Sequence, residues 1–134
     1  MGNTYIKLIS SEPYIEKAVV PGNKSFEEVA KEVIRRGDRE ADLEMVLPRL
    51  LGGRYGFTMD EYAVMYQPDV NQAATVIYNY PDPLSDDWHA ITGPVIVGKV
   101  VRDGYDGYRF DFLNDEEAEK VMGLIFGAIQ TVMK

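Results

Sequence analysis

The chain has 134 residues and a formal net charge of −8, and its 46% hydrophobic and 27% charged residues are typical of an ordinary globular protein. This length suits one domain, so we expect residues 1–134 to form a single domain. The sequence contains no cysteine and one histidine, His89, which excludes disulfide scaffolds, thiol catalysis and cysteine zinc sites and argues against a histidine-based metal site or catalytic triad.

Two strands and a helix are predicted in the first quarter of the chain. Residues 4–10 and residues 14–20 each alternate between apolar and polar side chains, as half-buried strands do, and the break between them predicts a hairpin or two neighbouring strands. Residues 25–36 carry one apolar stripe with the helical period. Ser25, followed three residues later by Glu28, has the capping-box pattern that begins a helix.

The pattern is less clear in the next stretch. Apolar residues in the segment 38–51 have helical spacing, but Pro48 interrupts them, so a helix that ends near Leu47 and a kinked helix both fit. Residues 55–59 and 62–67 flank a short acidic turn and predict a hairpin.

Residues 71–80 fit either a helix or a strand. Asn71 is a good helix N-cap, whereas residues 75–78 favour a strand. Beyond them, residues 94–101 are strongly apolar and β-branched, which predicts a central strand, and residues 108–113 alternate as its hairpin partner.

The last predicted element is a helix over residues 115–133. Asn114 precedes it as an N-cap, and acidic residues occupy its first turn, where the helix dipole favours them. Leu124, Phe126 and Met133 fall outside the main apolar stripe of this helix. Because a two-fold contact would remove these side chains from water, we predict a homodimer or a larger even-numbered oligomer that uses this helix.

The order of these elements indicates the fold class. Strands paired with their neighbours, with helices between them, predict an α+β fold. We expect a mainly antiparallel sheet of hairpins and two principal helices, at about residues 25–36 and 115–133.

The negative charge is concentrated in the second half of the chain. Residues 68–134 carry 11 acidic and 5 basic residues, or −6, whereas residues 1–67 carry 11 and 9, or −2. Such a surface repels phosphate backbones, so we expect no direct binding of nucleic acid. It suits a partner protein with a basic surface, and the alternative is that the charge only keeps the protein dissolved.

Aromatic and acidic residues are close together in the loops of this half. Tyrosine is favoured at protein interfaces, although strands also use it for its β-propensity. The candidate partner-binding residues are Tyr78, Tyr80, Asp82, Asp86, Asp87, Trp88, Asp103, Tyr105 and Asp106.

A second hypothesis is a protein that binds a small nucleotide signal. Arginines would bind its phosphate and an aromatic ring would stack on its base. The candidate ligand-binding residues are Arg54, Tyr55, Arg102 and Arg109. A third hypothesis, an uncharacterised enzyme, has no support from a catalytic set. We assign no catalytic residue and no cofactor. We also assign no metal site, because the aspartates near position 103 lack the order of a calcium loop.

Four segments of the second half resemble a known family. They are 71–74 (NQAA), 91–98 (ITGPVIVG), 110–113 (FDFL) and 114–120 (NDEEAEK). Together they are similar to small domains of unknown function that phages, plasmids and integrated elements carry, sometimes beside antirestriction genes. The resemblance implies a mobile-element setting and transfers no catalytic residue. The first half departs from the pattern, since residues 38–54 are longer and contain Pro48.

We therefore expect a non-enzymatic binding protein of a phage or mobile element, an acidic inhibitor of a host nucleic-acid-binding or defence protein. The N-terminal residues show no pattern of an export signal, and no apolar stretch is long enough to cross a membrane. These features predict a cytoplasmic protein that does not bind membranes.

Overall fold

The structure is a computed structural model that describes residues 4–10, 15–20, 24–34, 42–61, 69–80, 90–104 and 107–132, without the side chain of Asp103. Its elements, in chain order, are β1 (Thr4–Leu8), β2 (Ile15–Val19), α1 (Phe26–Ile34), β3 (Leu43–Val46), a short 3-10 helix η1 (Arg49–Leu51), β4 (Tyr55–Asp60), α3 (Gln72–Asn79), β5 (Val95–Asp103), β6 (Gly107–Asp111) and α4 (Asp115–Val132). The strands form one antiparallel sheet, so the predicted α+β class is confirmed.

The sheet is built around β5. Its strand order is β2-β1-β5-β4-β3, and β6 also pairs with β5. Lys99 of β5 lies opposite Tyr55 of β4 on one side and Asp111 of β6 on the other, so β6 shares an edge of β5 with β1. The predicted pairing of the first two strands, the central position of the apolar strand and the β5–β6 hairpin are all confirmed.

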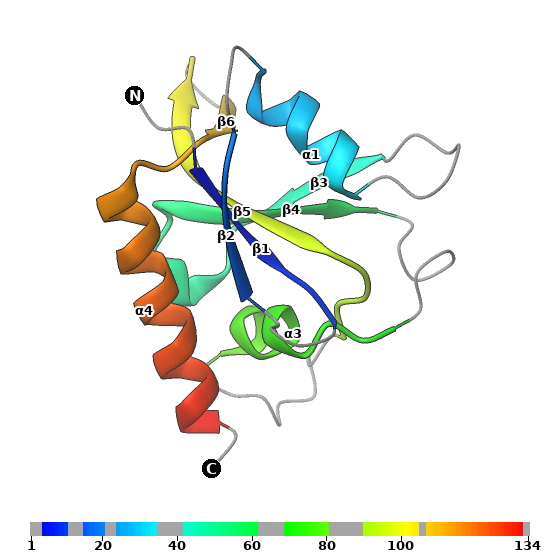
Figure 1. Ribbon diagram of the computed structural model, residues 1–134, viewed down its shortest axis with the longest axis vertical. Coiled ribbons are helices and arrows are strands. Elements are labelled where there is room, and N and C mark those ends of the chain that lie inside the picture. Colours follow the sequence, from blue (N-terminus) through cyan, green and yellow to red (C-terminus); the bar gives the residue numbers. More distant parts are fainter. Residues whose placement is uncertain are drawn as a thin grey trace.

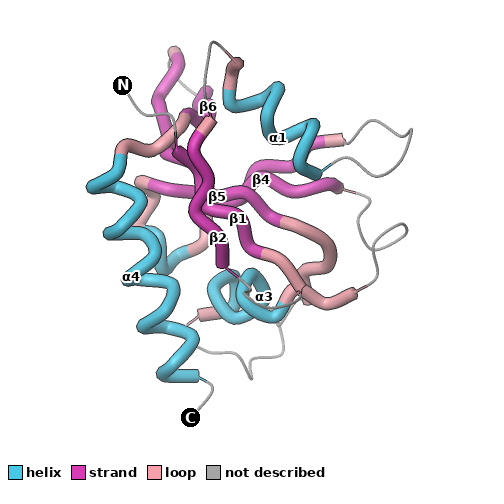
Figure 2. Tube along the Cα trace, viewed as in Figure 1, coloured by secondary structure: helices cyan, strands magenta, loops and turns pink. Residues whose placement is uncertain are grey.

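Helices cover both faces of the sheet (Figures 1 and 2). Alternate residues of β5 point to opposite faces, so Ile96 packs with the buried side chains of α1, whereas Val95 and Val97 pack with those of α3 and α4. No helix in the described ranges is long and apolar enough to span a membrane.

Two facing glycines allow α1 to approach the sheet closely. Gly56 of β4 lies opposite Gly98 of β5. A Cβ atom on Gly98 would lie 2.6 Å from Cζ of Phe26, and one on Gly56 would lie 2.4 Å from Cζ of Phe110. The two phenylalanine rings meet edge to face at 6.3 Å, in the space that these glycines leave. Glycine is therefore required at both positions by packing.

The helix predicted over residues 38–51 is wrong where the structure describes it, from residue 42 onward. Residues 43–46 pair with β4 as β3, and η1 follows Pro48. The helical spacing of the apolar residues did not indicate a helix here. An edge strand such as β3 buries its side chains only in part, so its sequence need not alternate strictly between apolar and polar residues. Strand β4 confirms the prediction for residues 55–59. Its predicted hairpin partner, residues 62–67, lies outside the described residues.

The open choice for residues 71–80 is settled as a helix, α3. Asn71 caps it, since its side-chain Oδ1 accepts a hydrogen bond from the N–H of Ala74 at 3.2 Å. The two principal helices are confirmed as α1 and α4, each within the predicted range.

Candidate functional site

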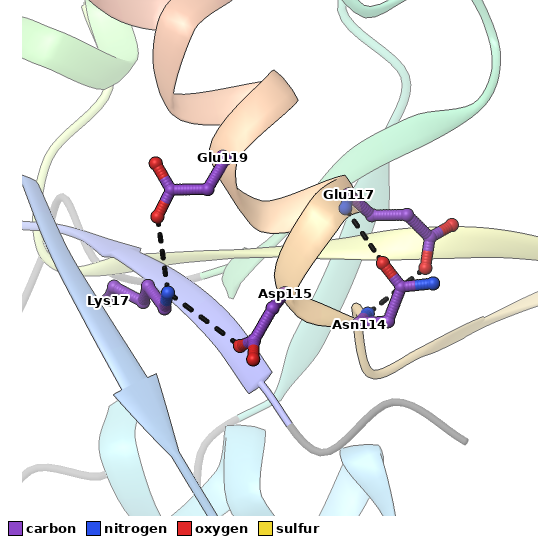
Figure 3. Close-up of polar contacts among 5 residues, drawn as sticks. All are labelled: Lys17, Asn114, Asp115, Glu117 and Glu119. Atoms are coloured by element: carbon purple, nitrogen blue, oxygen red, sulfur yellow. Dashed lines mark hydrogen bonds and ion pairs between the residues drawn. The ribbon is translucent and has the colours of Figure 1, made fainter.

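Helix α4 begins with a complete capping box. The Asn114 side chain accepts a hydrogen bond from the N–H of Glu117 at 2.8 Å, and the Glu117 carboxylate accepts one from the N–H of Asn114 at 3.0 Å (Figure 3). Both bonds use N–H groups that have no partner within the helix. The backbone of the first turn of α4 and the Glu117 side chain are therefore held in place.

Lys17, on the edge strand β2, forms ion pairs with two acidic side chains of this turn. Nζ of Lys17, on β2, lies 3.2 Å from Oε1 of Glu119 and 3.7 Å from Oδ1 of Asp115 (Figure 3). The two acids are four residues apart and so lie on one side of the helix. Their side chains remain 69% and 81% exposed, respectively, despite the lysine. We call Asp115, Glu116 and Glu119 the α4 acidic cluster.

A second lysine pairs with the inner side of the same turn. Nζ of Lys99 lies 3.4 Å from Oε2 of Glu117, whose side chain is only 21% exposed. Tyr55, the neighbour of Lys99 on β4, is buried, and burial raises the pKa of its phenol. The charge of Glu117 raises this pKa further, whereas Arg54 and Lys99 oppose the shift. Glu117 therefore has a structural role. The side chains of the α4 acidic cluster remain exposed to solvent and can contact another molecule.

Three side chains with raised pKa values, Tyr5, Tyr55 and Lys17, predict that the folded protein loses stability at alkaline pH. Burial, with Glu16 and Glu32 nearby, raises the pKa of Tyr5 above the ordinary 10.0, as burial does for Tyr55, and the hydrogen bond to Glu119 raises the pKa of Lys17 above 10.5. A raised pKa in the folded protein gives stability that is complete below the unfolded value and is lost as the pH rises through the folded value.

We therefore expect the free energy of unfolding, measured by urea denaturation, to fall as the pH rises above about 10. A Tyr5→Phe/Tyr55→Phe double variant should show a shallower fall than the wild-type protein. An equally steep fall in the double variant would show that these phenols do not cause the pH dependence.

Of the predicted partner-binding residues, the structure describes the side chains of Tyr78 and Tyr80 only, so the predicted surface stays a prediction. Tyr78 and Tyr80 lie at the end of α3, where both are half-buried against the core. Helix α3 begins beside the start of β5, as the hydrogen bond from Asn71 to the carbonyl of Gly93 shows. Asp103 is the last residue of this nine-residue strand, and at about 3.3 Å per residue it lies about 26 Å from the first. Figure 1 shows α3 near the bottom of the view and β6 near the top. The positions that lie outside the described residues are Asp82, Asp86, Asp87, Trp88, Tyr105, Asp106 and the side chain of Asp103.

The predicted ligand-binding residues are also separated. Arg109 lies opposite Val101, and Arg102 lies opposite Tyr108, so the two arginines extend from opposite faces of the β5–β6 hairpin. Arg109 lies 3.6 Å from Asp111, and the Tyr55 ring is buried in the core. Arg54 directly precedes Tyr55, and its carbonyl accepts a hydrogen bond from the N–H of Val100 at 2.9 Å. The structure therefore does not bring Arg102, Arg109 and the Tyr55 ring together around one phosphate and base.

No family model, curated protein or solved structure matches this chain. Within the described part of the chain, no three His, Cys, Asp or Glu side chains lie close enough together to hold a metal ion.

Two of the segments that carry the family resemblance form a buried unit. The N–H of Asn71 donates to the carbonyl of Ile91 at 2.8 Å, and its side-chain Nδ2 donates to the carbonyls of Leu8 and Gly93, both at 2.8 Å. Thr75 Oγ1 accepts a hydrogen bond from the N–H of Ile91 at 2.9 Å. These contacts are internal, so residues 71–74 and 91–98 support the fold.

The sequence interpretation assigned the α4 acidic cluster only to helix initiation. The spacing of Asp115 and Glu119 was visible in the sequence and could have indicated a shared face. Lys17 was missed, because it is separated from Glu119 by 102 positions in the chain and only the fold brings the two side chains together.

Proposed function

We propose that this protein is a non-catalytic binding protein of a phage or other mobile element that acts in the host cytoplasm. In this proposal, its α4 acidic cluster occupies a basic surface on a host nucleic-acid-binding or defence protein. The observation that carries the proposal is the exposure of Asp115 and Glu119, at 81% and 69%, on a helix end that the capping box fixes. The net charge of −8 adds long-range attraction for a basic partner.

The ion pairs with Lys17 are compatible with this role. An exposed ion pair contributes only about 0–1 kcal/mol, because water screens the charges and the side chains lose freedom. A guanidinium or ammonium group of a partner can therefore replace Lys17, or join it, at little cost. Since the capping box already holds the backbone of this turn, binding requires ordering of the acidic side chains only.

The nucleotide-binding hypothesis receives less support from the geometry. Arg102 and Arg109 lie on opposite faces of the hairpin, and Tyr55 cannot stack on a base while its ring is in the core. We therefore do not extend that hypothesis.

The test is a comparison of two double variants that lose the same charge. Asp115→Asn/Glu119→Gln removes two exposed acids of α4 that bind a lysine, and Glu27→Gln/Glu32→Gln removes two on α1, at 3.6 Å from Lys31 and 2.9 Å from Lys24. Each protein is immobilised and exposed to the basic fraction of a host lysate at increasing salt. We expect the α4 variant to lose about tenfold in affinity for the captured protein and to show a weaker dependence on salt.

The α1 variant should bind as the wild-type protein does. Equal losses in the two variants would show that only the total charge matters. An unchanged affinity in the α4 variant, or capture that does not depend on salt, would contradict the proposal.

A further inference from the structure

Helix α4 presents an apolar seam to solvent. At about 100° per residue, Gly123 and Gly127 lie along the centre of its outer side, with Leu124 on one flank and Phe126 on the other. A Cβ atom at either glycine would meet no atom within 4 Å. Leu124 is 37% exposed and Phe126 is 46% exposed, and Figure 1 shows α4 along the outside of the molecule. The core of this chain therefore does not require the glycines and leaves the two apolar side chains partly exposed.

The charges along the helix divide it into two parts. Asp115, Glu116, Glu117 and Glu119 are at its start, and residues 121–132 contain no charged residue. A second α4 that runs in the same direction would place its acids beside these acids, which is unfavourable. A second α4 that runs in the opposite direction would place its acids beside the uncharged end, and the two helix dipoles would also oppose each other favourably.

We infer that two copies of this chain pair through α4, with the helices antiparallel about a two-fold axis that passes beside Ile125. This inference specifies the oligomer contact predicted at Leu124 and Phe126. The third predicted position, Met133, lies outside the described residues. The pairing does not depend on the proposed function, because its central contacts at Gly123, Leu124, Phe126 and Gly127 involve no residue of the α4 acidic cluster.

The two-fold axis fixes which residues meet. Gly123 faces Gly127 of the partner subunit, and the absence of side chains at these positions lets the two backbones approach closely. Residues beside the axis meet their own counterparts, so each Phe126 lies against the other on one flank and each Leu124 against the other on the second flank. Lys120 faces Gln130 of the partner subunit.

This register makes opposite predictions for two substitutions that add the same charge. Phe126→Glu places two carboxylates beside each other across the axis and removes the aromatic contact, so we expect the dissociation constant of the dimer to rise at least about tenfold. Gln130→Glu places a carboxylate opposite Lys120 of the partner subunit, so the dimer should be retained or strengthened. Sedimentation equilibrium measures both, and circular dichroism confirms that each variant is folded.

A wild-type chain that stays monomeric at millimolar concentration would overturn the inference. Equal weakening by the two substitutions would also overturn it, because the proposed register would then be wrong.

Cysteine cross-linking tests the direction of the helices in a second way. The native chain contains no cysteine, so each single variant carries one reactive thiol. We expect a short bismaleimide to join two copies of the Phe126→Cys or Leu124→Cys variant. It should not join the Gln130→Cys variant, whose two thiols would be about 15 Å apart along the helix axis. Cross-linking of Gln130→Cys but not of Phe126→Cys would show another arrangement and would contradict the antiparallel pairing.

Discussion

Replacement of Gly98 by valine is expected to destabilise the protein by about 3 kcal/mol. A Cβ atom at this position would lie 2.6 Å from Cζ of Phe26 and 3.0 Å from the backbone carbonyl oxygen of Asp111. The Phe26 ring would have to leave this position, and the carbonyl belongs to the adjacent strand β6, whose backbone is held by its pairing with β5. Urea denaturation should show a lower midpoint with a similar slope, as expected for a change in stability alone.

A paired substitution tests whether the ring is the cause. Phe26→Leu shortens the side chain that fills the space above Gly98, so the cost of Gly98→Ala should be smaller in the Phe26→Leu background than in the wild-type protein. Gly123→Ala is the control, since its Cβ atom meets open space, and it should not destabilise the protomer. Additive effects of the first two changes would show that Phe26 does not limit residue 98.

Replacement of Asn71 by alanine is expected to cost about 3–5 kcal/mol, because one side chain carries three buried hydrogen bonds. It caps α3 through Ala74 and donates to the carbonyls of Leu8 and Gly93. The residue is fully buried, so water replaces these bonds only if the packing opens. Thermal and urea denaturation should both show the loss.

Serine at position 71 separates the two roles of this side chain. Asn71→Ser keeps an oxygen that can cap α3, but its single hydroxyl proton cannot serve both carbonyls. We expect its stability to lie between those of the wild-type protein and Asn71→Ala. If serine is as stable as asparagine, the contacts with Leu8 and Gly93 contribute little and the cap explains the whole effect.

The features that the sequence predicted correctly depend on local patterns. The stripe of α1 buries Phe26, Val29, Ala30 and Ile34, and the N-cap signals at Ser25 and Asn114 are both used. Leu124 and Phe126, which fall off the stripe of α4, are exposed as their position predicted. Helical period and capping chemistry act within a few residues, so sequence reasoning can identify them.

The features that it did not predict depend on contacts between distant segments. Residues 43–46 form a strand because β4 offers them an edge, although their apolar spacing favoured a helix. Asn71 caps α3 locally, but its bond to the carbonyl of Leu8, 63 positions away, is a contact that only the fold brings about. The candidate surface was missed for the same reason, because Lys17 approaches Asp115 and Glu119 only after β2 joins the sheet.

Carboxylate footprinting tests the role of the α4 acidic cluster most directly. The protein is labelled with a carbodiimide and an amine, alone and with the basic host protein that it captures, and the label at each acidic side chain is quantified by mass spectrometry. We predict that labelling of Asp115, Glu116 and Glu119 falls in the complex, whereas labelling of Glu27 and Glu32 on the opposite face of the sheet does not change. Protection of the α1 acids with unchanged labelling of the α4 acidic cluster would contradict the proposed binding surface.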